Sequence, residues 1–151
     1  MAMPEEHTHR MAFISRIFRA ASDLHIVLYR RLDSQRVRRT AGLPVLLLIV
    51  PGRRSGREIT NPVCYPETDK GYAVAGSAGG TDADPQWFKN LRAAQEAQVE
   101  IGRTTTRVRV RVLPREERDL LWPRFLTEGT TFEGYEGRTE RVIPIAVLTP
   151  V

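Results

Sequence analysis

Apolar and polar positions follow a helical period at the start of the chain. From Met11 to Leu32 apolar residues recur every three or four positions with arginines on the opposite side, which predicts an amphipathic, basic helix. The polar residues 1–10 before it are expected to be a disordered tail, and residues 11–151 a single domain. We expect the helix to pack on the domain or, alternatively, to rest on an anionic membrane or cover an apolar substrate.

The pattern after this helix predicts mainly strands. The unbroken apolar run Leu43–Val50 indicates a strand buried on both faces. Further strands are expected at 58–66, 72–76, 99–101, 106–113 and 142–148, with helices at 85–94 and 114–126 and a glycine-bearing loop over 127–141. Asp84 is expected to cap the first of these two helices. About six strands and two further helices predict a mainly β (α+β) fold, a small barrel.

Arginine supplies nearly all of the positive charge. The 151 residues carry a formal net charge of +5, and Lys70 and Lys89 are the only lysines. Guanidinium groups bind anions in bidentate fashion, so the basic surface suits nucleic acid, an anionic membrane or a small ligand with phosphate or carboxylate groups. Arg107, Arg109 and Arg111 alternate with valines, but no aromatic side chains lie between them to stack bases, so we expect no nucleic-acid partner.

Cysteine and histidine usage bears on compartment and chemistry. Cys64 is the sole cysteine and cannot form an internal disulfide, and no apolar run is long enough to cross a membrane. A cytoplasmic protein is therefore expected, with peripheral membrane contact as a possibility for the first helix. Cys64 is expected to be a small core residue, and His7 and His9 lack further ligands, so no metal site is expected.

Two glycine-flanked loops each follow a predicted strand. The segment Gly52–Gly56, of sequence GRRSG, offers backbone N–H groups, two guanidinium groups and a hydroxyl to oxyanions, unless it is simply a polar turn. The segment Gly76–Gly80, of sequence GSAGG, would let a flat ring or a phosphate approach the main chain, unless it is a flexible loop. Trp87 and Asn90 follow on one helical face.

Several motifs in one register resemble the deazaflavin-dependent nitroreductase family. They are LLLIVPGRRSG at 46–56, NP at 61–62, AGSAGG at 75–80, DPQWFKNL at 84–91 and R-x-I-P-I at 141–145. The resemblance implies a split β-barrel, FMN-binding-like, that binds coenzyme F420, a deazaflavin with a phosphodiester and a polyglutamate tail. It further implies a reductase that passes hydride to a flat, electron-poor acceptor such as a quinone, a nitroaromatic or an unsaturated lactone.

The resemblance also implies roles for individual residues. The cofactor would be bound by Gly52, Arg53, Arg54, Ser55, Arg57, Asn61, Pro62, Ala75, Ser77, Gly79, Gly80, Trp87 and Asn90. Once hydride arrives, the acceptor becomes anionic, and the hydroxyls of Ser77 and Tyr135 are the candidate catalytic donors. Phe132 and Tyr135 would wall the substrate pocket, unless they only pack their loop onto the barrel.

Two departures from the family pattern bear on binding. Ile59 stands where some members carry arginine or lysine. One contact with the polyglutamate tail of the cofactor would therefore be lost or taken over by Arg57. Cys64 stands where some members carry tyrosine, which leaves the acceptor preference open. Two alternatives for the whole chain also stay open: a carrier that binds deazaflavin or lipid without turnover, and an FMN-using relative of the same barrel.

Overall fold

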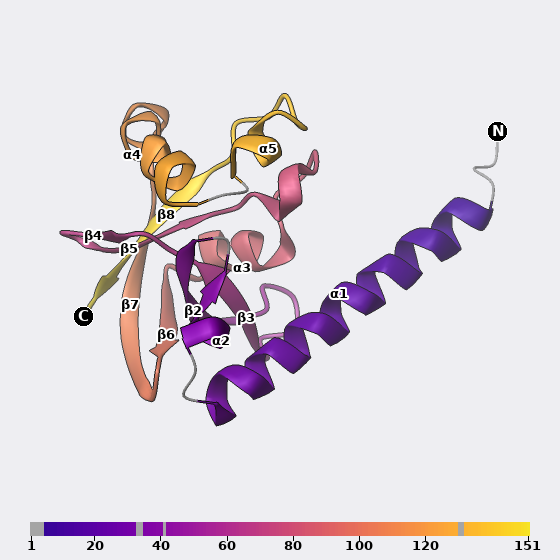
Figure 1. The fold of residues 1–151 in the computed structure, drawn as a ribbon, viewed down its shortest axis with the longest axis horizontal. Coiled ribbons are helices and arrows are strands. Elements are labelled where there is room, and N and C mark those ends of the chain that lie inside the picture. Colours follow the sequence, from indigo (N-terminus) through magenta and orange to yellow (C-terminus); the bar gives the residue numbers. More distant parts are fainter. Residues whose placement is uncertain (1–4, 33–34, 41, 130–131) are drawn as a thin grey trace.

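The computed structural model describes residues 5–32, 35–40, 42–129 and 132–151, and its centre is an antiparallel sheet (Figure 1). Two strands of two residues each, β1 (Arg39–Thr40) and β4 (Glu67–Thr68), add to the six longer strands of the described chain. The longer strands are β2 (Leu43–Pro51), β3 (Glu58–Cys64), β5 (Gly71–Ala75), β6 (Glu96–Ile101), β7 (Thr104–Val112) and β8 (Ile145–Pro150).

The strand pairings form a curled sheet. β2 pairs with β3 and with β6, and the pairing continues through β7 and β8 to β5. β4 follows β3 along the chain and pairs with β5, so the segment 58–68 connects the two ends of the sheet. The expected mainly β barrel of about six strands is thereby confirmed.

Side chains alternate between two apolar clusters on opposite faces of the sheet. On β5, Val74 packs inside the barrel with Leu48 of β2, whereas Ala73 and Ala75 face a second cluster outside it. The inner cluster is closed by Phe88 and Leu91 of α3 (Gln86–Ala94). The outer cluster is completed by aromatic side chains of α4 (Arg115–Glu128) and α5 (Phe132–Glu136).

Several element boundaries differ from the prediction. The first helix, α1 (Glu5–Arg31), begins six residues before Met11, so residues 5–10 are helical and not part of a tail; residues 1–4 lie outside the described residues. The expected loop 127–141 contains α5, and a further short helix, α2 (Gln35–Arg38), precedes β1. β8 begins at Ile145 and not at 142, because Pro144 has no N–H to donate to a ladder.

The first helix docks through its C-terminal turns, while its N-terminal part projects past the barrel (Figure 1). Tyr29 is buried and donates to the carbonyl oxygen of Val45 at 3.0 Å, and His25 Nε2 lies 2.9 Å from the carbonyl oxygen of Val37. The first helix therefore packs on the domain as expected, but most large residues of its apolar stripe are exposed: Ile17, Phe18, Leu24, Leu28 and Leu32. No helix among the described residues is long and apolar enough to cross a membrane.

Candidate active site

A pocket of about 210 Å³ lies where β3, the end of β5, α3 and α5 meet. Its lining contains six of the residues singled out from the sequence: Pro62, Ala75, Ser77, Trp87, Phe132 and Tyr135. Thr40, Val63, Cys64 and Ala78 also line it and were not predicted to do so. Cys64 lies two residues after Pro62 on β3, so strand periodicity alone was a signal that both side chains share one face.

Two of the predicted residues that line this pocket carry hydroxyl groups. Ser77 follows β5, and Tyr135 lies on α5. Neither side-chain oxygen forms a hydrogen bond with another residue of the described chain. The Tyr135 ring packs edge-on against Phe132, with ring centroids 5.4 Å apart, and Phe132 is buried among the aromatics of α4. The aromatic pair therefore both packs α5 onto the sheet and forms one wall of the pocket.

Two glycines of the Ser77 loop allow close packing against protein. Gly80 ends the short 3-10 helix η1 (Ala78–Gly80), which also contains Gly79, and has φ +80°. A Cβ on Gly80 would lie 2.5 Å from the carbonyl oxygen of Tyr135. A Cβ on Gly76 would lie 2.9 Å from the Phe88 ring. The absence of side chains at Gly76 and Gly80 thus holds the loop against α3 and α5, which keeps Ser77 and Tyr135 in one pocket.

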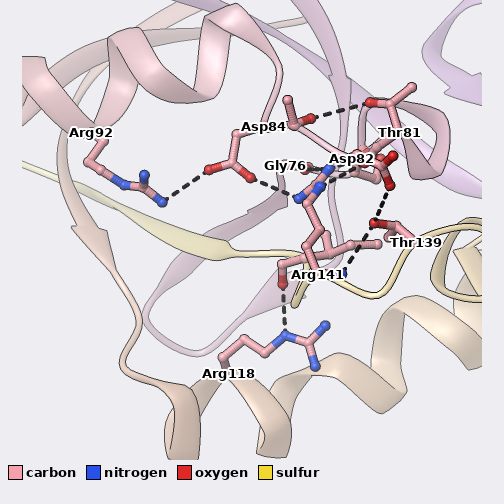
Figure 2. A network of polar contacts seen from close by, with 11 residues as sticks. Gly76, Thr81, Asp82, Asp84, Arg92, Arg118, Thr139 and Arg141 are labelled. Atoms are coloured by element: carbon pink, nitrogen blue, oxygen red, sulfur yellow. Dashed lines mark hydrogen bonds and ion pairs between the residues drawn. The ribbon is translucent and has the colours of Figure 1, made fainter.

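One guanidinium group ties this loop to the segment that precedes β8 (Figure 2). Arg141 donates to the carbonyl oxygens of Gly76 at 3.0 Å, Ser77 at 2.9 Å and Thr81 at 2.7 Å. It also donates to Asp84 Oδ1 at 2.8 Å. The Arg141 side chain is only 16% exposed, so these bonds are shielded from competing water.

The predicted cap of α3 by Asp84 is wrong. Pro85 occupies the N-cap position, and no side chain caps the helix there. The Asp84 carboxylate instead accepts from Arg141 and forms an ion pair with Arg92 at 3.3 Å. Two guanidinium partners offer charge-assisted hydrogen bonds, which are stronger than the bond a neutral backbone N–H would give at the helix start.

The arginine-containing segment between β2 and β3 is a closed turn. Gly52 N donates to the carbonyl oxygen of Arg57 and Gly56 N to that of Gly52, each at 2.8 Å. Gly56 has φ +70°, a conformation that favours glycine. Arg57 N donates to Ser55 Oγ at 3.2 Å, so the serine hydroxyl is engaged within the turn. The turn is polar and compact, and its arginine side chains extend from it.

The arginine turn does not line the pocket but is attached to the helix that does. Arg53 donates to Asn90 Oδ1 from its main-chain N–H at 3.2 Å and from Nη1 at 2.7 Å, and its Nη2 donates to Gln86 Oε1 at 2.7 Å. Asn90 is 5% exposed. Trp87, on the same helix, lines the pocket. Helix α3 therefore positions the turn and the pocket relative to each other.

Three groups of the arginine turn and of β3 are available to a ligand. Arg54 and Arg57 are exposed, and neither side chain has a hydrogen-bond or ion-pair partner within the described chain. Asn61 Nδ2 is buried without a hydrogen-bond partner among the described residues. An unsatisfied buried N–H costs about 1–3 kcal/mol, so an acceptor atom on a ligand would be favourable there. The donor set fits an anionic ligand that also carries polar ring atoms.

Burial controls the chemistry of the pocket cysteine. Desolvation raises the pKa of the Cys64 thiol to about 11, so it is protonated at neutral pH. Tyr65, which directly follows β3, packs in the inner cluster, on the side opposite to Cys64 as the strand period predicts. Cys64 therefore contributes a small neutral wall to the pocket and no nucleophile.

The basic face of β7 is partly neutralised. Arg107 pairs with Glu96 at 3.0 Å, and Arg111 pairs with Glu117 at 2.6 Å. Of the three alternating arginines, only Arg109 has no ion-pair partner within the described chain. This face therefore offers less free positive charge than the sequence alone indicates.

The chain is similar to known proteins over most of its length. A family model described as "F420H(2)-dependent quinone reductase" matches residues 22–150. A Mycobacterium tuberculosis protein named as an F420H(2)-dependent quinone reductase is 28% identical over 131 residues, covering 83% of this chain and 87% of that protein. Another protein of that organism, with the same activity in its name, is 34% identical over 108 residues, covering 72% and 91%.

The chain is also similar to solved structures. The chain aligns with a structure titled "Structure of F420-H2 Dependent Reductase (FDR-A)" at a TM-score of 0.63 and 27% identity, covering 70% of this chain and 93% of that one. A chain titled "domain-swapped dimer" aligns at a TM-score of 0.64 and 25% identity, covering 76% and 87%.

Proposed function

The chain belongs to the F420H(2)-dependent quinone reductase family, and from this premise we propose that it reduces a quinone held between Ser77 and Tyr135. It is an F420H2-dependent reductase, and its cofactor is coenzyme F420. The observation that carries the proposal is the pocket itself, whose lining brings together Ser77 and Tyr135, two residues whose hydroxyls have no partner within the described chain, with Trp87 and Pro62.

The cofactor is held by the groups left available at the turn and on β3. Arg54 and Arg57 bind the phosphate and the polyglutamate tail, because exposed guanidinium groups without internal partners lose no existing bond on binding an anion. Asn61 donates its buried Nδ2–H to a polar atom of the ring. Arg53 and Asn90 act mainly on each other and keep the turn in place.

When bound, coenzyme F420 supplies a hydride from its ring. Trp87, Pro62 and Ala75 form an apolar surface that excludes water and orients a flat acceptor. A quinone that accepts hydride becomes an oxyanion, and the hydroxyl of Ser77 or Tyr135 donates a hydrogen bond to that oxygen and passes it a proton. The net change is a two-electron reduction to the hydroquinone, and solvent restores the proton of the hydroxyl.

The proposal is tested by an acceptor comparison with the purified protein and reduced F420. A naphthoquinone, a nitroaromatic and an unsaturated lactone are mixed in turn, and return of the oxidised deazaflavin absorbance is followed. We expect turnover with the quinone above the enzyme-free rate, and tighter binding of F420 than of FMN in parallel titrations. Turnover with the nitroaromatic or the lactone but none with the quinone would refute the proposed acceptor.

A further inference from the structure

We propose that Arg141 is a positioning residue for the reaction, whose guanidinium holds the Ser77 loop in the shape that presents the serine hydroxyl to the acceptor (Figure 2). This inference rests on the proposed function of Ser77. Arg141 lies 64 residues from Ser77 in sequence and is not among the residues that line the pocket. It therefore acts through the loop and does not itself contact the acceptor.

The Ser77 loop contains two residues with positive φ, beside its own short-range hydrogen bonds from Ser77 N to the carbonyl oxygen of Ala75 and from Gly80 N to that of Ser77, each at 2.9 Å. Ala78 has φ +47° and Gly80 φ +80°, and an alanine in this left-handed region is strained by its own Cβ. Such conformations persist only where the surroundings determine them. Arg141 bonds to the loop on both sides of the strained residues, at the carbonyls of Gly76 and Ser77 before them and of Thr81 after them. The N–H groups of one guanidinium thus bind the main chain on both sides of Ala78 and Gly80.

The same guanidinium connects the loop to α3. Its Nη1 donates to Asp84, the residue before the N-cap of the helix, and Asp84 in turn pairs with Arg92 in the last turn of α3. Helix α3 carries Trp87 of the pocket. Arg141 therefore fixes Ser77 and Trp87 relative to each other without lining the pocket itself. A lysine in its place has one ammonium group and no planar fork, so it cannot reach all of these acceptors.

Matched variants separate positioning from general stability. Arg141→Lys is compared with Arg118→Lys, because Arg118 of α4 is a buried arginine that donates to the carbonyl oxygen of Ile143 at 2.8 Å, on the segment that carries Arg141. Within the described chain, no hydrogen bond or ion pair joins Arg118 to residues 76–84, and Figure 2 shows its bond to the segment that precedes β8. Amide hydrogen exchange of peptides covering 76–84 is measured without cofactor, followed by kcat and KM for the quinone and the Kd of F420.

We expect Arg141→Lys to speed exchange in 76–84 and to lower kcat about 10-fold or more, since small misplacement of a reacting group is costly, while the Kd of F420 changes less than about threefold. Arg118→Lys should lower the melting temperature and leave exchange in 76–84 unchanged. Unchanged exchange in Arg141→Lys, or equal kinetic losses in the two variants, would overturn the inference. A wild-type protein inactive with quinone would instead defeat the proposed function, and the exchange result would still decide whether Arg141 shapes the loop.

Discussion

Arg53 and Asn90 are joined twice, because the main-chain N–H and the guanidinium Nη1 of Arg53 both donate to the same amide oxygen of Asn90, at 3.2 and 2.7 Å. A buried asparagine on α3 thus anchors an exposed turn between β2 and β3. The resemblance to the deazaflavin enzymes assigns both residues to the cofactor. In the structure their first partners are each other, so we expect them to act on the cofactor by fixing the turn.

Removing the Asn90 amide should weaken cofactor binding indirectly. In Asn90→Ala the Arg53 N–H and guanidinium lose their shared acceptor, and the turn that carries Arg54 and Arg57 loosens. We expect the Kd of F420 to rise about 10-fold, equivalent to about 1.4 kcal/mol, and the melting temperature to fall. Fluorescence titration and thermal melts measure the two effects. Gln86→Ala removes one exposed bond to Arg53 and should change either quantity much less.

Arg54 and Arg57 should contribute to affinity without contributing to stability. Both are exposed and lack side-chain partners within the described chain, so Arg54→Ala and Arg57→Ala leave no internal group unpaired. We expect each variant to raise the Kd of F420 about 3- to 10-fold, with a weaker dependence of the Kd on salt, because fewer charges meet the anion. The melting temperature should stay within about 1 °C of the wild type, as is usual for surface substitutions.

A control separates tail binding from general charge. Arg109→Ala removes an equally exposed arginine from the β7 face. It should leave the Kd of F420 unchanged, and none of the three variants should alter binding of a deazaflavin that lacks the phosphate and glutamate tail. Equal losses in Arg109→Ala and Arg54→Ala would show that the arginine turn has no special part in binding.

The Cys64 thiol should resist alkylation over the ordinary pH range. Its pKa is raised to about 11 from 9.0 by burial, so about 1% is thiolate at pH 9, where an unperturbed thiol is about half ionised. Labelling by iodoacetamide, followed by mass spectrometry, should be slow at pH 8 and should rise as the pH approaches 11. The same sample unfolded in urea provides the reference rate. Rapid labelling of the folded protein at pH 8 would contradict the protonated thiol.

The barrel could be predicted from the sequence because apolar residues follow regular patterns along its long strands. The run Leu43–Val50 and the alternating segment 106–113 both correspond to observed strands, β2 and β7. The short strands β1 and β4 were missed, since two residues carry no periodicity. Helix α1 was expected to pack on the domain and does so, but through Tyr29 and His25, while most of its apolar stripe is exposed. Hydrophobic spacing shows that a helix has an apolar face and not which neighbour covers it.

The candidate site was predicted mainly through its motifs. The deazaflavin-dependent resemblance is confirmed by the family match over residues 22–150. Motifs also placed Ser77 and Trp87, and the need for a hydroxyl donor singled out Tyr135; the structure brings all three into one pocket. The partners of Arg141 could not be predicted, because a contact with Ser77 across 64 residues depends on tertiary packing. The prediction that Asp84 caps α3 was wrong for the same reason. Its carboxylate binds Arg141 and Arg92, which only the tertiary fold brings close to it.

The hydroxyl pair is tested by replacing each member conservatively. Ser77→Ala and Tyr135→Phe each remove one donor from the pocket without removing an internal hydrogen bond of the described chain. Each should lower kcat for quinone reduction about 10- to 100-fold, less than the roughly 10²–10³-fold typical of a single oxyanion donor because the other hydroxyl remains, with the Kd of F420 little changed. Steady-state assays with reduced F420 in excess give both parameters.

The most direct measurement is a single-turnover experiment in a stopped-flow instrument. Protein saturated with reduced F420 is mixed with a naphthoquinone, and the return of oxidised deazaflavin absorbance is recorded for the wild type and for the Ser77→Ala, Tyr135→Phe double variant. We predict rapid reoxidation by the wild type and a rate at least about 100-fold lower for the double variant, with F420 bound in both. Reoxidation at the same rate in both proteins, or no faster than without protein, would contradict the assignment of this pocket as the site of quinone reduction.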